Sequence, residues 1–161
     1  MLKKNKFTSV ARPLLLLGML TVFLLLFSYS TSPLTADCTS SDSTFFMLVG
    51  KGMTKGYMPY RDFFDMKGPY LFFIEYIGQL ISYGRNGIFA VQILFMFITL
   101  YFFDKSYRLV MKKENLFLEI VMLGTMLVLG CGTIQEGNLC EEINMPFLSV
   151  CLYMALYYFK K

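Results

Sequence analysis

The sequence predicts an all-α polytopic membrane protein, with about four transmembrane helices and one or two interfacial helices in a large first extracytoplasmic loop. Three observations predict this class. Of the 161 residues, 56% are hydrophobic and only 16% are charged. Long uncharged runs recur along the chain, and the basic residues gather beside these runs. The net charge of +4 therefore reflects cytoplasmic loops under the positive-inside rule rather than a nucleic-acid-binding surface.

The first predicted span covers residues 13–30, after a basic cytoplasmic segment at residues 1–12. About 18 residues without charge are enough to cross a hydrocarbon core of ~30 Å at 1.5 Å per residue. The alternative is a cleaved signal peptide, in which residues 14–27 form the apolar region and residues 34–36 the cleavage site. We favour the anchor, because the following segments also have the composition of membrane helices and need a partner helix.

Residues 31–85 are predicted to form the extracytoplasmic loop. A short helix is expected over residues 43–52, with Asp42 or Ser43 as its N-cap. A second helix begins at Pro69 and runs to Tyr83. It is short for a span and carries Glu75 and Gln79. We therefore place it along the membrane interface as an amphipathic helix.

This placement fixes the remaining topology of a single membrane domain, residues 1–161, with a cytoplasmic N-terminus in the cell membrane. If residues 69–83 crossed the bilayer, the basic clusters after the next span and at the chain end would face outward, against the positive-inside rule. The expected order is a second span at 86–103, a cytoplasmic loop at 104–115, a third span at 116–133, an extracytoplasmic loop at 134–144 and a fourth span at 145–159.

Acidic residues then gather on one side of the membrane. Seven of the eleven acids face the extracytoplasmic compartment, namely Asp37, Asp42, Asp62, Asp65, Glu136, Glu141 and Glu142. Cys38 and Cys140 would face the same side, which leaves a disulfide between them as an alternative to two free thiols.

The densest mixture of charged and aromatic residues lies at 57–69, YMPYRDFFDMKGP. It holds Arg61, Asp62, Asp65 and Lys67 within seven positions. With Asp42, the last two form a set of two carboxylates and a cation, which suits group transfer from a phosphate donor. One carboxylate accepts the proton of an attacking hydroxyl, while Lys67 and Arg61 offset charge on the departing phosphate. Solvated interfacial charges, and a capping role for Asp42, are the alternatives.

These residues also belong to a longer pattern. It comprises Asp42-Ser43 after the first span, a Gly-x-x-Pro-Tyr-x-Asp motif at residues 56–62 and a Phe-Asp-x-Lys-Gly-Pro motif at residues 64–69. A Gly-Asn-Leu-x-Glu-Glu motif follows at residues 137–142. The pattern resembles the N-terminal part of bacterial C-type polytopic glycosyltransferases, the superfamily of protein O-mannosyltransferases and lipid A aminoarabinose transferases. Its members take sugars from polyprenyl phosphates.

The resemblance implies that Asp42 is the catalytic base, that Asp65 and Lys67 bind acceptor or donor phosphate, and that Glu141 and Glu142 line the same cavity. Arg61 and Asp62 are added as candidate substrate-binding residues. The implied reaction transfers a sugar to an acceptor hydroxyl on the extracytoplasmic side, with no required cofactor; a divalent metal stays open. Met66 replaces a frequent histidine, and Cys140 a frequent threonine.

Length is the larger departure from the family, because relatives have on the order of ten or more spans. We therefore expect a truncated transferase of the cell envelope that is inactive alone and whose partners are membrane lipids, the polyprenyl-phosphate sugar and a separate chain carrying the remaining spans. No nucleic-acid partner is expected. The alternative is a non-catalytic small membrane protein, either a degenerate remnant or a subunit of a larger transferase.

Overall fold

The computed structural model describes residues 17–23, 25, 26, 28–36, 40–111 and 136–160. These residues form helices and connecting loops without a β-strand, apart from one isolated bridge between Pro59 and Phe63. The labelled helices are α2 (Ser41–Thr54), α3 (Pro69–Ile81), α4 (Arg85–Met111) and α7 (Cys140–Lys160). The predicted all-α class is thus confirmed for this part of the chain.

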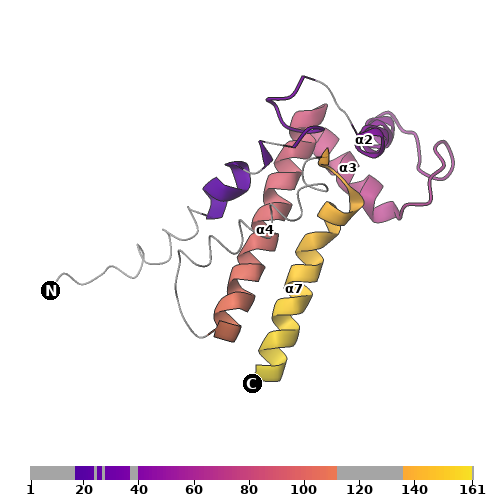
Figure 1. Ribbon diagram of the computed structural model, residues 1–161. Coiled ribbons are helices and arrows are strands. Elements are labelled where there is room, and N and C mark those ends of the chain that lie inside the picture. The colour runs from indigo at the N-terminus through magenta and orange to yellow at the C-terminus, as the bar shows by residue number, and fades with distance from the viewer. Residues whose placement is uncertain (1–16, 24, 27, 37–39, 112–135, 161) are drawn as a thin grey trace.

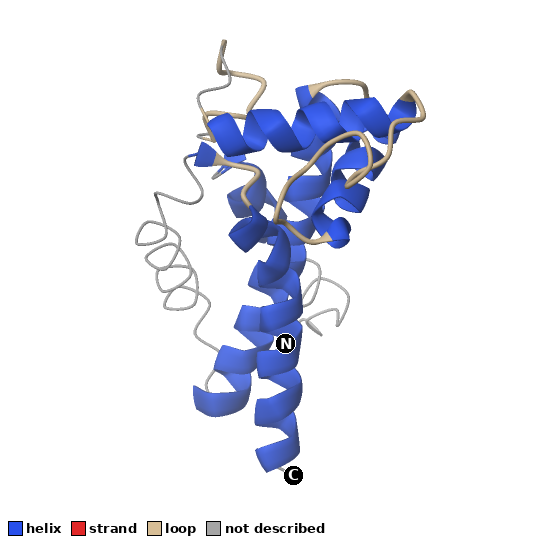
Figure 2. Ribbon diagram, turned by 90° about the vertical axis from the view of Figure 1, so that its right-hand side faces the viewer, coloured by secondary structure: helices blue, strands red, loops and turns tan. Residues whose placement is uncertain are grey.

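Two long helices form the body of the described structure. Helices α4 and α7 pack side by side and run in the same direction, away from α2 and α3, which lie together at one end of the pair (Figures 1 and 2). Their contact includes the tilted ring pair of Phe102 and Tyr153, with centroids 5.6 Å apart. Near the N-terminus, Leu17 and Leu25 pack on α4, where Leu25 joins Met96 and Leu100 in a buried cluster.

One of the described helices is long and apolar enough to cross a membrane. It is α4, with a mean hydropathy of 1.9 over its most apolar 18 residues. Helix α7 does not reach this standard, because its acidic first turn and Lys160 enclose a shorter apolar stretch that contains Pro146 and several tyrosines. The predicted count of four spans is therefore not confirmed, and the third span at 116–133 lies outside the described residues.

Helix α2 begins earlier than its composition predicts. Its N-cap is Ser40, whose hydroxyl accepts a hydrogen bond from the Ser43 amide at 3.4 Å. The prediction of Asp42 or Ser43 as the cap was wrong, because Ser40 offers the same capping oxygen two or three residues upstream. Asp42 instead occupies the exposed first turn, where a carboxylate interacts favourably with the helix dipole. Its side chain is therefore not used up as a cap.

Helix α3 starts at Pro69 as predicted, but it ends at Ile81 rather than at Tyr83. Glu75 and Gln79, the polar residues that interrupt this apolar helix, are only 0% and 4% exposed. Its outer side instead shows apolar residues, with Phe73 53% and Leu80 62% exposed. The polar positions Glu75 and Gln79 therefore point into the protein together with Leu71 and Phe72, while other apolar residues of α3 are exposed.

A tight corner joins α3 to α4. A Cβ atom added at Gly87 would overlap the carbonyl oxygens of Gly78 and Ser82, and one added at Gly78 would overlap the Ile88 side chain. The Gly78 carbonyl also caps α3 by accepting the Ser82 amide at 3.1 Å. Two glycines therefore allow the helices to approach this closely.

Helix α4 continues beyond the predicted span of 86–103 to Met111, so the expected loop at 104–115 is helical at least to that residue. An i,i+4 ion pair supports this extension, with Arg108 Nε 3.0 Å from Asp104 Oδ1. Helix α7 likewise begins at Cys140, inside the predicted loop at 134–144, and Pro146 lies within the helix rather than at its start. The acidic pair at residues 141 and 142 favours this earlier start.

Candidate functional site

Lys67 brings together groups from three segments of the chain. Its Nζ lies 3.5 Å from Cys140 Sγ, and the Cys140 thiol donates to Glu141 Oε2 at 3.1 Å. The Asp42 carboxylate is close enough to contribute to the charge environment of Lys67. The loop before α3 therefore contacts the first turn of α7, and the charge of Asp42 from the first turn of α2 acts on the same ammonium. These residues are here called the lysine cluster: Asp42, Lys67, Cys140 and Glu141.

The charges of the lysine cluster reinforce one another. The contact with Cys140 contributes most to raising the pKa of Lys67, and the nearby carboxylates of Glu141 and Asp42 raise it further. The hydrogen bond from Cys140 lowers the pKa of Glu141. Burial raises the pKa of the Cys140 thiol, and the hydrogen bond to Glu141 adds to this. At neutral pH the cluster thus holds an ammonium, a neutral thiol and an ionised Glu141.

The loop that carries Lys67 has a defined shape. Tyr60 adopts a left-handed conformation with φ 66, and its hydroxyl donates to the Lys67 carbonyl at 2.6 Å. Its ring also packs edge-on against Phe72 of α3, with centroids 5.8 Å apart. A non-glycine residue in this conformation is held by its surroundings at some cost. Tyr60 therefore ties the backbone of Lys67 to α3.

The other candidates of the central stretch do not join the lysine cluster. Arg61 and Asp62 pair with each other at 2.7 Å, and the Asp62 carboxylate also accepts the Met58 amide. The hydrogen bond from Arg61 lowers the pKa of Asp62. Asp65 accepts the amide of the next residue, Met66, at 2.6 Å. These contacts are local to the loop, so the predicted roles of Arg61, Asp62 and Asp65 stay predictions.

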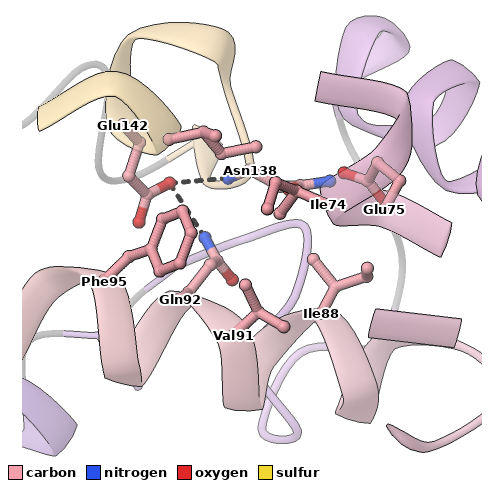
Figure 3. A pocket seen from close by; sticks show the side chains of 9 residues that line it. Ile74, Glu75, Ile88, Val91, Gln92, Phe95, Asn138 and Glu142 are labelled. Atoms are coloured by element: carbon pink, nitrogen blue, oxygen red, sulfur yellow. Dashed lines mark hydrogen bonds between the residues drawn. The ribbon is translucent and has the colours of Figure 1, made fainter. Parts of the chain in front are cut away.

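Glu142 points away from Lys67 into the protein. Its Oε2 atom accepts a hydrogen bond from Gln92 Nε2 of α4 at 2.9 Å and another from the Asn138 amide at 2.8 Å (Figure 3). It is 6% exposed, and burial raises its pKa to about 7. The adjacent residues Glu141 and Glu142 therefore have different partners, whereas the family resemblance implies that both line one cavity.

A second buried carboxyl group lies beside this one. Glu75 of α3 is 0% exposed, and burial raises its pKa to about 8, the side-chain amide of Asn138 opposing that rise. The Asn138 amide nitrogen faces the Glu75 carboxyl group in Figure 3, although no hydrogen bond of regular geometry joins them. The set Glu75, Gln92, Asn138 and Glu142, here called the buried polar cluster, surrounds a small cavity of about 10 Å³, otherwise lined by apolar side chains.

Sequence reasoning missed most of the buried polar cluster. Glu75 and Gln79 were interpreted as interruptions of an apolar helix, although their i,i+4 spacing puts both on one helical face. Gln92 is the polar residue in the middle of an apolar run, and Asn138 was noted only as part of a motif. An isolated polar residue in an apolar helix is the signal that could have identified Glu75 and Gln92.

The described cysteines and acids are not arranged as a disulfide or metal centre. Cys140 and Cys151 carry free thiols, which argues against a disulfide at Cys140, and Cys38 lies outside the described residues. Within residues that the structure describes, no group of three or more Cys, Asp or Glu side chains is placed to hold a metal ion.

Comparison with known proteins finds no matching family model, no matching curated protein and no matching solved structure. A functional assignment therefore depends on the motifs and on the geometry of the two clusters.

Proposed function

We propose that the chain is glycosyltransferase-like and that the lysine cluster is its site for the phosphate of a polyprenyl-phosphate sugar and for the acceptor hydroxyl. The observation that carries the proposal is the contact of Lys67 with Cys140 at the start of α7, where the charges of Glu141 and Asp42 also act on its ammonium. Lys67 remains protonated at neutral pH and provides the cation for a phosphate. Asp42, exposed and not used as a cap, is the candidate base.

The geometry also supports the motif-based pairing of distant segments. Motifs at residues 42–43, 64–69 and 137–142 are separated in sequence by other elements, yet Asp42, Lys67 and Glu141 contribute to one charge environment. Sugar transfer would then proceed by attack of an acceptor hydroxyl on the anomeric carbon. Its proton goes to Asp42, the bond to the lipid phosphate breaks, and Lys67 neutralises the released phosphate.

Lipid-phosphate binding tests this proposal without requiring turnover. For the full chain in nanodiscs, we expect Lys67→Met to weaken binding of undecaprenyl phosphate about 10- to 100-fold, because a charge-assisted hydrogen bond is worth about 1.5–3 kcal/mol. Lys55→Met is the matched control, since Lys55 is exposed and lies in the same loop region. Asp42→Asn should retain this binding, because Asp42 is proposed as the base and not as a ligand of the phosphate.

Equal affinities for the Lys67 and Lys55 variants would remove the lysine cluster as the phosphate site. Such a result would favour the alternative, a non-catalytic membrane protein. In that case the contacts of Arg61 with Asp62 and of Lys67 with Cys140 only stabilise the fold.

We further propose the multi-pass topology, with the α2 and α3 end extracytoplasmic. Helices α4 and α7 both run from that end. Their far ends carry the basic residues Arg108 and Lys160, as the positive-inside rule expects. The apolar outer side of α3 then lies against lipid at the interface.

Cysteine labelling tests this topology. In a variant without the four native cysteines, we expect Lys55→Cys to react with a membrane-impermeant maleimide in intact cells, and Met111→Cys to react only after permeabilisation. Labelling of both positions in intact cells would contradict the topology.

A further inference from the structure

The buried polar cluster contains carboxylate oxygens that the surrounding residues leave unpaired. Both carboxyl oxygens of Glu75 and the Oε1 atom of Glu142 are buried without a hydrogen-bond partner, as are Gln92 Oε1 and Asn138 Nδ2. An ionised carboxylate in such a setting costs several kcal/mol, whereas a neutral carboxylic acid costs far less. The arrangement therefore favours a proton on the cluster.

The cluster also joins elements that are otherwise connected through loops. Glu75 comes from α3, Gln92 from α4, Asn138 from the segment before α7, and Glu142 from α7 itself. Asn138 is the central member, because its backbone amide donates to Glu142 while its side chain faces Glu75 (Figure 3). It adopts a left-handed conformation with φ 59 and is 1% exposed, so its position is determined by these neighbours.

No opposite charge compensates Glu75 among the residues that the structure describes. Helix α2 approaches it through the backbone at Gly50, where an added Cβ would lie 2.9 Å from Glu75 Cβ. Lys51 of α2 lies over the Tyr83 ring, and Arg85 at the start of α4 has a buried Nη1 atom without a partner among the described residues. Neither shifts the pKa of Glu75, on which only burial and Asn138 act. From α4 the polar side chain that lines this cavity is the neutral Gln92, and α7 contributes Glu142, which would repel an ionised Glu75.

We propose that Glu75, Asn138 and Glu142 form a proton-controlled latch, which holds the segment before α7 against α3 while Glu75 is protonated and releases it when Glu75 ionises. The segment leads directly into Cys140 and Glu141, so the latch sets their position beside Lys67. The latch follows from the buried contacts alone and does not require the proposed transferase activity. Its chemical trigger is a single proton taken up from or lost to water.

Hydrogen exchange of the full chain in detergent or nanodiscs tests the latch. The reporters are the amides of residues 138–143, among them the Asn138 amide bound to Glu142 and the Ile143 amide bound to the Leu139 carbonyl. After correction for the intrinsic pH dependence of exchange, we expect their protection to fall about 10-fold or more from pH 6.5 to pH 9. Protection of the distal amides of α7, residues 152–158, should stay constant.

Two isosteric variants make the test specific. Glu75→Gln should keep the protection of residues 138–143 high at both pH values, while Glu142→Gln should retain the pH-dependent loss. Protection that does not change with pH in the unmodified chain would overturn the proposal. The proposal would also be overturned if Glu75→Gln lost as much protection at pH 9 as the unmodified chain. It would be overturned equally if Glu142→Gln alone abolished the pH-dependent loss of protection.

Discussion

Gly87→Ala is expected to prevent stable folding of the corner between α3 and α4. A methyl group at this position would overlap two backbone carbonyl oxygens, those of Gly78 and Ser82. Neither oxygen can move freely, because the Gly78 carbonyl caps α3 by accepting the Ser82 amide and Ser82 is the C-cap residue. Overpacking that shifts the backbone costs about 1–3 kcal/mol and occasionally more, and overlap with two carbonyl oxygens places this variant at the upper end. Such a cost is a large part of the stability of a small protein.

The measurement is the thermal unfolding midpoint in detergent, together with the yield of monodisperse protein. Gly18→Ala is the matched control, because among the described residues its added methyl would meet only Phe97 Cε2, at an ordinary contact distance of 3.9 Å. The substitution also replaces glycine by a better helix former, so its midpoint should equal or exceed that of the unmodified chain. Equal unfolding midpoints for Gly87→Ala and Gly18→Ala would contradict the prediction, since they would show that α3 and α4 can separate at this corner without losing stability.

The sequence predicts the helical class well, since the apolar runs and the proline at residue 69 are local signals. The start of α3 and the existence of α2, α4 and α7 follow from such signals. Helix ends are less well predicted, because the capping oxygen of Ser40 and the acidic first turn of α7 compete with equally plausible neighbours. The span count also exceeds what the described helices support.

The sequence does not predict which side of α3 is buried. A polar residue in a short apolar helix is expected to face water, but Glu75 and Gln79 have partners that come from outside the helix. Gln79 exchanges two hydrogen bonds with the Gly84 backbone, and Glu75 faces Asn138, 63 positions later in the sequence. Such partners are set by tertiary packing, so hydrophobic periodicity alone cannot reveal them. The same holds for Cys140, whose contact with Lys67 joins segments 73 residues apart.

Glu75→Gln should stabilise the protein at alkaline pH, which is the second large effect. Burial raises the pKa of this carboxyl group from 4.5 to about 8. Between these values the folded state holds a proton that the unfolded state has released. The free energy of unfolding therefore decreases as pH rises through this window and changes no further above it. A tenfold change in the proton affinity of the carboxylate corresponds to about 1.4 kcal/mol, so removing the titration should add a few kcal/mol at pH 8.

Thermal unfolding of the two proteins from pH 5 to pH 9 measures this effect. The midpoint of Glu75→Gln should exceed that of the unmodified chain by an amount that grows up to about pH 8, at about 2–4 °C per kcal/mol for a chain of this size. Near pH 5 the two unfolding midpoints should be equal, or that of Glu75→Gln should be the lower. The glutamine amide brings an additional N–H donor into a cluster in which Asn138 Nδ2 already lacks an acceptor. Glu136→Gln, at an exposed carboxyl group near the same segment, should follow the unmodified chain at every pH. Parallel curves for Glu75→Gln and Glu136→Gln would mean that Glu75 is hydrated in solution, which would remove the physical basis of the latch while leaving the lysine cluster untouched.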